Sequence, residues 1–250
     1  MDFTPYANEI VQSSKFLGAA LAMGFGAIGA GLGTFRSAVS AVQGMARQPK
    51  QDMLILRTML ITQAVTESAS IFALVVACLL LFVPTATVTP ENYIYIASGM
   101  VATGFAMGLG AIGGGIGMGL TGEKAVSGVS RNPESVSEVQ FVHLLGSAVA
   151  GNPSVFGLVV ALLIFIFDYS QTMVLPQAFA LMGAGISMGL GAIGCGIGCG
   201  VPGGAACEAV AKKPESRPVF VRTMLIGQAV SQSTSVYALV IAFLLLYVVK

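Results

Sequence analysis

The stretch Gly24-Phe25-Gly26-Ala27-Ile28-Gly29 decides the fold, because the chain repeats it twice more. It returns as Gly108-Leu109-Gly110-Ala111-Ile112-Gly113 and as Gly189-Leu190-Gly191-Ala192-Ile193-Gly194. A second marker follows each copy at a constant spacing: Ala46-Arg47-Gln48-Pro49, then Ser130-Arg131-Asn132-Pro133, then Ala211-Lys212-Lys213-Pro214. Separated markers that keep one register indicate three tandem copies of one unit. We expect these units at residues 1–86, 87–170 and 171–250.

The composition is typical of a membrane protein. Of the 250 residues, 55% are hydrophobic and 9% are charged, against about 25% charged residues in soluble domains. The net charge of +1 leaves no basic surplus to neutralise phosphates, which argues against a nucleic-acid partner. Each unit has two apolar segments longer than the roughly 20 residues that cross a bilayer: 10–45 and 53–83, 92–129 and 137–168, 173–210 and 218–249. We therefore predict an all-α membrane protein of six transmembrane helices, arranged as three tandem helical hairpins.

The basic residues predict the orientation of the hairpins. Ten of the 12 lysines and arginines lie in or near the loops inside the three units: Arg36, Arg47, Lys50, Arg57, Lys124, Arg131, Lys212, Lys213, Arg217 and Arg222. The positive-inside rule then puts these loops in the cytoplasm. Both termini and the two linkers between units would face the opposite side.

The glycine string also matches the dinucleotide-binding fingerprint G-x-G-x-x-G. That fingerprint needs a preceding strand and a helix N-terminus that opens onto phosphate, whereas this string lies inside an apolar segment. We interpret the glycines as packing positions, since glycine lets helices approach closely in membranes. A glycine stripe on the first helix of every unit predicts an inner ring of helices with the second helices outside. Ordinary bundle packing is the alternative interpretation.

One carboxylate is expected inside the membrane. Of the 11 acidic residues, only Glu67 lies far from a loop or terminus, near the middle of segment 53–83. A carboxylate at that depth is costly and indicates a functional site, because it can be neutralised by a proton or by a small cation. The aligned positions are Gly151 and Gln232, neither of which ionises. Asn152-Pro153, directly after Gly151, predicts a disturbed helix there.

The remaining reactive side chains suggest no catalytic site. We expect the four cysteines, Cys78, Cys195, Cys199 and Cys207, to be small buried residues, although Cys195 and Cys199 are one helical turn apart. No His or carboxylate joins them at metal-ligand spacing. We expect His143, the only histidine, at the membrane interface.

Taken together, these motifs resemble those of the rotor-ring proteolipid of rotary ATPases, known as the c subunit. The Gly-rich first helix, the Arg-Gln/Asn-Pro loop and the carboxylate midway along the second helix carry the resemblance over the whole chain, as three fused hairpins. It implies a non-catalytic subunit without a cofactor in an oligomeric c-ring, homo- or hetero-oligomeric, surrounded by lipid and coupling ion transport to rotation. It implies that Glu67 carries the ion opposite the stator a subunit. The loops Arg47-Gln48-Pro49 and Arg131-Asn132-Pro133 look like the bacterial F-type loop, which implies contact with the central stalk and a bacterial cell membrane.

The transported ion is a proton or sodium. Val65, Glu67 and Ser68 are similar to the pattern of sodium-binding rings, in which a backbone carbonyl, a carboxylate and a hydroxyl are ligands. Those rings also carry a Gln on the first helix, where this chain has Thr34. Thr34 and Thr66 are then the candidate hydroxyl donors.

Two other functions remain open at this stage. A V-type proteolipid also fuses hairpins and loses carboxylates, and it is the nearest alternative. A passive channel or a structural bundle is an alternative of another class, and it would need no lone acid. One carboxylate per three hairpins further predicts a rotor biased toward ATP hydrolysis, because more ATP free energy is available for each ion moved.

Overall fold

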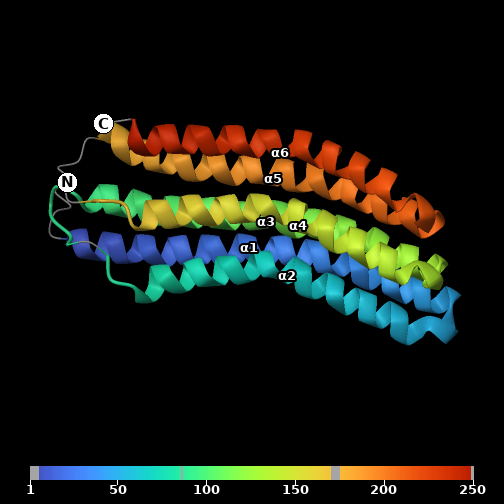
Figure 1. The fold of residues 1–250 in the computed structure, drawn as a ribbon. Coiled ribbons are helices and arrows are strands. Elements are labelled where there is room, and N and C mark those ends of the chain that lie inside the picture. Colours follow the sequence, from blue (N-terminus) through green and yellow to red (C-terminus); the bar gives the residue numbers. More distant parts are fainter. Residues whose placement is uncertain (1–5, 86, 170–174, 249–250) are drawn as a thin grey trace.

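The chain folds into three helical hairpins that lie side by side. The structure is a computed structural model, and it describes residues 6–85, 87–169 and 175–248. Hairpin 1 consists of α1 (Ala7–Arg47) and α2 (Asp52–Phe82), hairpin 2 of α3 (Tyr93–Arg131) and α4 (Val136–Phe165), and hairpin 3 of α5 (Leu175–Lys212) and α6 (Arg217–Tyr247). A short 3₁₀ turn joins the two helices of each hairpin: η2 (Pro49–Gln51), η3 (Pro133–Ser135) and η4 (Pro214–Ser216). Figure 1 shows the three turns at one end of the molecule and the termini at the other.

The six predicted segments are confirmed as helices, with bounds that differ from the expected ones by a few residues. The expected start at 173 and end at 249 fall outside the described residues. The prediction of a disturbed helix at Pro153 was wrong, because α4 continues through it without a break. All six helices are long and apolar enough to cross a membrane. At about 1.5 Å per residue, α1 is longer than the roughly 30 Å hydrocarbon core requires.

The helices form two layers. In the inner layer α3 packs between α1 and α5, while in the outer layer α2 contacts both α1 and α3, and α4 contacts both α3 and α5. The helix α6 packs on α5 and α4, and it is the least buried of the six spans. The hairpins therefore form an open sector, in which hairpin 1 and hairpin 3 each leave one edge free.

Glycines set the spacing within the inner layer. A Cβ atom at Gly29 would meet the Ala111 carbonyl of α3, and one at Gly113 would meet the Ala192 carbonyl of α5. Only glycine permits such backbone contact between helices. The equivalent glycine in hairpin 3, Gly194, has nothing within 4 Å. The surface of α5 that carries Gly194 is therefore one free edge of the sector.

The opposite edge shows the complementary pattern on α1. A Cβ at Gly115 would press on the backbone of Gly29, and one at Gly196 would press on the backbone of Gly113. Their equivalent in hairpin 1, Gly31, has nothing within 4 Å. The two free edges thus carry the same two glycine positions that meet at each junction within the chain.

Candidate functional site

The carboxylate of Glu67 lies on the exterior of the sector at the midpoint of α2. Its side chain is exposed, and no described residue forms a hydrogen bond or ion pair with the carboxylate. About 15 residues of helix, or roughly 22 Å, separate it from either end of α2. In a membrane-spanning helix that position lies deep in the hydrocarbon layer, where an unpaired charge is costly.

The neighbouring residue Thr66 faces inward instead. Thr66 is buried against α1, its methyl group lies where a Cβ on Gly33 would stand, and its hydroxyl donates to the Thr62 carbonyl at 2.8 Å. The Thr34 hydroxyl donates to the Ala30 carbonyl of its own helix at 3.0 Å. Neither predicted hydroxyl contacts Glu67 in the described structure.

Two flanks of the outer helices explain this arrangement. We call Gln63, Glu67 and Ser70, with their repeat equivalents, the Glu67 flank, and Leu54, Val65, Ser68 and Phe72, with their equivalents, the Ser68 flank. At 100° per residue, the two flanks lie on different sides of one helix. In α2 the Ser68 flank faces hairpin 2, because Leu54 packs against a cluster that contains residues of α3 and α4. Within one chain, Val65 and Ser68 therefore face away from Glu67.

Hairpin 3 shows what the Glu67 flank faces when a preceding hairpin is present. Gln228, the equivalent of Gln63, is buried and donates from Nε2 to the Gly146 carbonyl of α4 at 3.0 Å and to the Cys199 carbonyl at 2.8 Å. The Cys199 thiol lies 3.8 Å from Oε1 of Gln232, the equivalent of Glu67. In α6 the Glu67 flank thus packs against hairpin 2. In α2 the same flank faces the free edge of the sector.

The equivalent position in hairpin 2 contains no polar side chain. A Cβ on Gly151 would lie 3.1 Å from Met118 Sδ, so Met118 covers this position. One turn further along, the Ser154 hydroxyl donates to the Gly110 carbonyl at 2.9 Å. The position equivalent to Glu67 at the junction of hairpins 1 and 2 therefore holds no carboxylate.

The free edge of α6 carries a second copy of the predicted ligand pair. The Ser233 hydroxyl donates to the Val230 carbonyl at 2.7 Å, as Ser68 does to Val65 at 2.7 Å. In α6 this flank is uncovered, since Val230 is 69% and Tyr237 67% exposed. The two free edges thus carry different polar groups. The edge of hairpin 1 has a carboxylate, and the edge of hairpin 3 has a hydroxyl beside a carbonyl.

The loop residues differ between hairpins 1 and 2. Arg47 is exposed and is the last residue of α1, Gln48 is its C-cap, and Pro49 starts η2. Arg131 instead pairs with Glu208 of α5 at 3.2 Å, and Asn132 Nδ2 donates to the Ala211 carbonyl at 2.9 Å.

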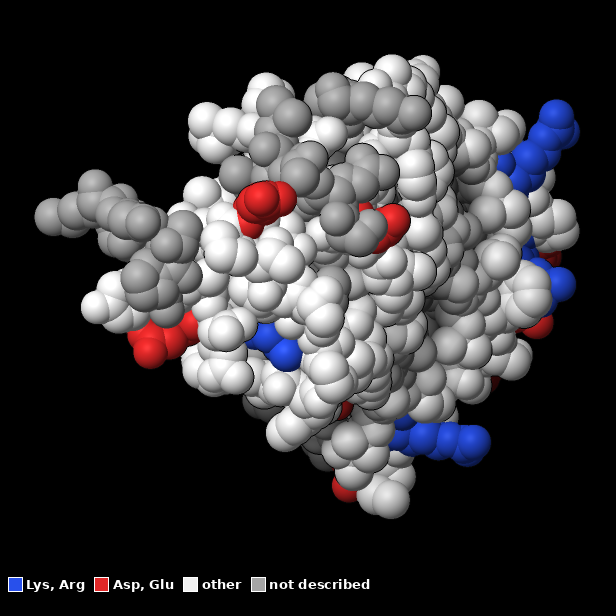
Figure 2. Space-filling view, turned by 90° about the vertical axis from the view of Figure 1, so that its left-hand side faces the viewer, with Lys and Arg blue, Asp and Glu red and all other residues white. Residues whose placement is uncertain are grey.

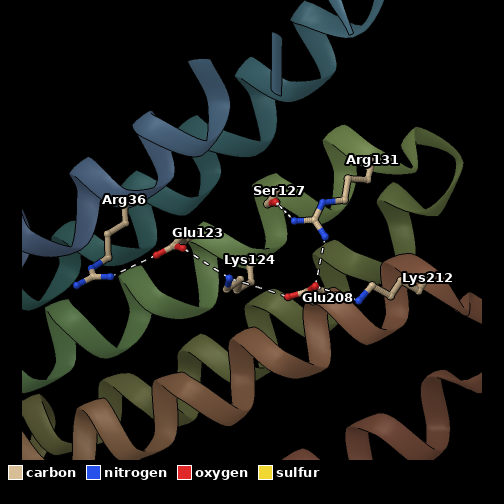
Figure 3. A network of polar contacts seen from close by, with 7 residues as sticks. All are labelled: Arg36, Glu123, Lys124, Ser127, Arg131, Glu208 and Lys212. Atoms are coloured by element: carbon tan, nitrogen blue, oxygen red, sulfur yellow. Dashed lines mark hydrogen bonds and ion pairs between the residues drawn. The ribbon is translucent and has the colours of Figure 1, made fainter. Parts of the chain in front are cut away.

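Arg131 belongs to a charged network at the loop end of the inner layer (Figure 3). Arg36 pairs with Glu123 at 3.3 Å, and Lys124 lies 4.0 Å from Glu208. The network joins α1, α3 and α5 in order. In contrast, the opposite end of the molecule presents mainly uncharged side chains (Figure 2).

Burial adds to the expectations for His143 and the cysteines. His143, expected near the membrane interface, lies two turns from the start of α4 and is 1% exposed, so other helices cover it. The prediction that the cysteines are buried holds for Cys195, Cys199 and Cys207, whereas Cys78 is exposed. The sequence did not indicate that Gln228 and Gln232 of α6 lie beside Cys199, because residues 29 and 33 positions apart meet only in the folded hairpin.

Comparison with known proteins agrees with this architecture. The family model for the ATP synthase c subunit matches three separate stretches, residues 17–80, 101–164 and 182–245. The chain is 44% identical to the ATP synthase c subunit of Mesomycoplasma hyopneumoniae (strain 7448) over 72 residues, which are 29% of this chain and 70% of the relative. It is 45% identical to the ATP synthase c subunit of Prochlorococcus marinus (strain AS9601) over 75 residues, 30% of this chain and 93% of the relative.

Each matched stretch begins on the inner helix of a hairpin and ends on its outer helix. Three repeats of the family unit therefore correspond to the three hairpins. This chain belongs to the family of ATP synthase c subunits: it is a multi-pass, non-catalytic rotor subunit of the membrane sector, with three family repeats fused in one polypeptide.

Proposed function

We propose that Glu67 is the only ion-carrying group of this rotor subunit, and that its site forms at the junction between one chain and the next subunit of the ring. The single observation that carries the proposal is that Glu67 is exposed on the free edge of the sector, whereas the same flank of hairpin 3 contacts hairpin 2 through Gln228. Residues 1–86 then form the hairpin that carries the ion site. Residues 87–170 lack the carboxylate, and residues 171–250 have a glutamine instead.

The matching glycines of the two free edges support a head-to-tail ring. Gly194 on one edge and Gly31 on the other are open in the single chain, and their repeat equivalents are in backbone contact at both junctions within the chain. A heterologous contact of this kind repeats until the rotation closes into a ring. A second copy of the chain is therefore our proposed neighbour. Single-hairpin c subunits in a mixed ring are the alternative neighbour, and the subunit mass of the purified ring distinguishes the two.

At such a junction, the neighbour's Ser68 flank faces Glu67. With a second copy as neighbour, the donors are the Val230 carbonyl and the Ser233 hydroxyl, which already lie together at 2.7 Å. Oxygen donors of this kind suit a hard cation such as sodium, and they can equally hold a protonated carboxyl by hydrogen bonds. Thr34 remains a candidate ligand on the carboxylate side, because its equivalent Cys199 lies beside Gln232, the equivalent of Glu67. Thr66 is buried, turned away from Glu67 and bonded to the Thr62 carbonyl, so we no longer propose it as a ligand. The Glu67 carboxylate neutralises the bound ion, so the loaded site passes through the lipid without a net charge.

The two serines provide a matched test of this junction. We expect Ser233→Ala to weaken ion protection of Glu67 by about tenfold or more, because a hydrogen bond to a charged group contributes about 1.5–3 kcal/mol. We expect Ser68→Ala to change it by less than about twofold, since Ser68 faces hairpin 2. The measurement is the sodium concentration, or the pH, that half-protects Glu67 from a hydrophobic carbodiimide in the purified ring. Equal effects of the two substitutions would contradict the junction.

The same labelling experiment tests the carrier and identifies the ion. We expect one fast-reacting carboxylate per chain, located at Glu67 by peptide mass spectrometry. Protection by sodium at constant pH identifies a sodium carrier, and protection only by low pH identifies a proton carrier. A chain that does not react at Glu67 would favour a passive channel or a structural bundle.

The remaining partners follow from the position of the charged loops. We propose that the loops face the cytoplasm of a bacterial cell and that Arg47, Gln48 and Pro49 contact the central stalk, joined by Pro133. Arg131 and Asn132 already hold hairpin 3 through Glu208 and Ala211. An arginine of the stator a subunit is the proposed counter-charge of Glu67.

One carboxylate per three hairpins also affects the direction of work. Each turn of the ring moves as many ions as it has carboxylates, while the catalytic head determines the ATP used per turn. A ring made only of this chain therefore has more ATP free energy for each ion. We propose that it works as a pump driven by ATP hydrolysis, in F-type or V-type form. A count of one carboxylate for every hairpin in the purified ring would remove this proposal.

A further inference from the structure

The loop ends of the outer helices meet in one pattern at the junctions within the chain. At the junction of hairpins 2 and 3, Arg217 of α6 pairs with Glu138 of α4, and its guanidinium lies 4.8 Å from the ring centroid of Phe141. Counted after the proline that starts each turn, Arg217 is the third residue, while Glu138 and Phe141 are the fifth and eighth. The third residue of one outer helix therefore faces the fifth and eighth residues of the preceding outer helix.

The junction of hairpins 1 and 2 follows this pattern without an ion pair. Its third residue is Val136 and its fifth is Leu54, and both pack against one apolar cluster. Its eighth residue is Arg57, which is exposed and forms no ion pair with a described residue. The same positions thus meet at both junctions, although the residue types differ.

The two free edges of the sector carry opposite charges at these positions. Hairpin 3 has Val219 as its fifth residue and Arg222 as its eighth, while hairpin 1 has Asp52 as its third. Arg222 and Asp52 are both exposed, and neither forms an ion pair within the part of the chain that the structure describes. The Asp52 carboxylate accepts the backbone N–H of Met53 at 2.6 Å, which leaves its other oxygen for a partner. A cation on one edge and an anion on the other are complementary when two chains meet head to tail.

An apolar groove lies open between α5 and α6 at the same end of the free edge. Its volume is about 430 Å³, and Ala206 and Phe220 are among the residues that line it. Their equivalents in hairpin 1 are Ala41 and Ile55. Those two residues form a buried cluster with Val126 of α3, so the following hairpin covers this position within the chain.

The free edge of hairpin 1 carries the side chain that corresponds to this cover. Val42 is the repeat equivalent of Val126 and is 68% exposed. We propose that the groove binds Val42 of a second copy of this chain, and that Arg222 forms an ion pair with Asp52 of that copy. This inference rests on the proposed head-to-tail ring, and it adds the contact by which one chain selects the next.

Such an ion pair has a role that the junctions within the chain do not need. The linkers keep hairpins 1, 2 and 3 in order, whereas the contact between two chains is selected by its surfaces alone. Opposite charges at an interface determine partner choice and register more than affinity. Because both groups are exposed near the loop end, the strength of the pair should fall as salt rises.

Zero-length crosslinking tests the pair in the intact ring. With Arg222→Lys, we expect a water-soluble carbodiimide to join the new amine to Asp52 and to give multiples of the chain mass on denaturing gels. Asp52→Asn should abolish these products. Arg217→Lys should instead crosslink to Glu138 without a change of mass, because that pair lies within one chain. Arg57→Lys is the matched control, since the position opposite it is uncharged, and it should give no crosslinked multiples.

Charge reversal provides a second measurement. We expect Asp52→Lys and Arg222→Glu each to raise the dissociation constant of the junction between chains about two- to fivefold at low salt, and the double substitution to recover most of this loss. The fraction of chains in rings, followed on native gels during dilution in detergent, measures the effect. High salt should remove the differences, and Arg57→Glu should leave the rings unchanged.

Three results would overturn the proposal: no crosslinked multiples with Arg222→Lys, a crosslink from this position to a single-hairpin subunit, or a double charge reversal that recovers nothing. These results are separate from a failure of the carrier. A ring without the crosslink in which ions still protect Glu67 from carbodiimide refutes the ion pair alone. A ring with the crosslink in which Glu67 does not react supports the contact between chains and refutes the carrier.

Discussion

Replacing Glu67 by glutamine is expected to reduce ion-coupled ATP hydrolysis and ion transport to background. The side chain keeps its size, but it can no longer alternate between a charged and a neutralised form. No other group replaces it, because the equivalent positions hold Gly151 and Gln232. The measurement is ion uptake into vesicles that contain the reconstituted complex, driven by ATP.

Glu91→Gln is the matched control for this substitution. Glu91 is an exposed carboxylate in the linker between hairpins 1 and 2, away from the middle of any helix. We expect a complex with Glu91→Gln to transport ions at the same rate as the unmodified complex. The carrier role of Glu67 would be refuted by a Glu67→Gln complex that still pumps ions at the normal rate in a ring made only of this chain. In a mixed ring, residual pumping would come from carboxylates of other subunits, so the ring composition has to be determined first.

Leucine at Gly31 is expected to prevent ring assembly while the chain itself still folds. Gly31 has nothing within 4 Å in the single chain, whereas its equivalents Gly115 and Gly196 press on neighbouring backbones. In the ring, the added side chain would meet the edge of α5 that carries Gly194. Overpacking typically costs about 1–3 kcal/mol, and the cost recurs at every junction between chains. Native gel mass and electron microscopy of detergent-purified protein measure the loss of rings.

Two further substitutions make this result specific. Gly115→Leu places the same side chain at a junction within the chain, so it should destabilise the fold itself. Ala64→Leu adds the same bulk on an exposed part of α2, where lipid accommodates it, and the ring should remain. A ring that forms normally with Gly31→Leu would mean that the chain meets its neighbour through another surface.

The two predictions fail independently. A complex with Glu67→Gln should still form rings, because the Glu67 side chain is exposed and glutamine keeps its size. A chain with Gly31→Leu should still contain Glu67, but without a second chain opposite its carboxylate. Carbodiimide labelling of that unassembled chain should proceed without sodium protection, since the Val230 and Ser233 oxygens are no longer opposite Glu67. This outcome distinguishes a site built between chains from one contained in hairpin 1.

The amino-acid sequence by itself determined that the chain forms three hairpins and that Glu67 is the one carboxylate in the middle of a helix. Apolar runs longer than a bilayer, three repeats in constant register and a single mid-helix carboxylate can all be recognised along the chain, because they depend on local hydrophobicity and spacing. The predicted helix bounds and the family were confirmed for the same reason. The order of the hairpins and the pairing of loop residues such as Arg131 with Glu208 were not predictable in this way.

Only the tertiary structure decided which neighbour each flank faces. Sequence spacing suggests that Val65, Ser68 and Glu67 act together, since they are close along the chain. The orientation of α2 about its axis turns Glu67 to the free edge and Ser68 toward hairpin 2. The orientation of α6 places Ser233 on the opposite edge of the sector. The pairing of Cys199 with Gln232 and the burial of His143 arise in the same way. Contacts between two helices depend on how each helix is rotated relative to the other. The sequence of one helix shows which residues share a face, but not which neighbour that face meets.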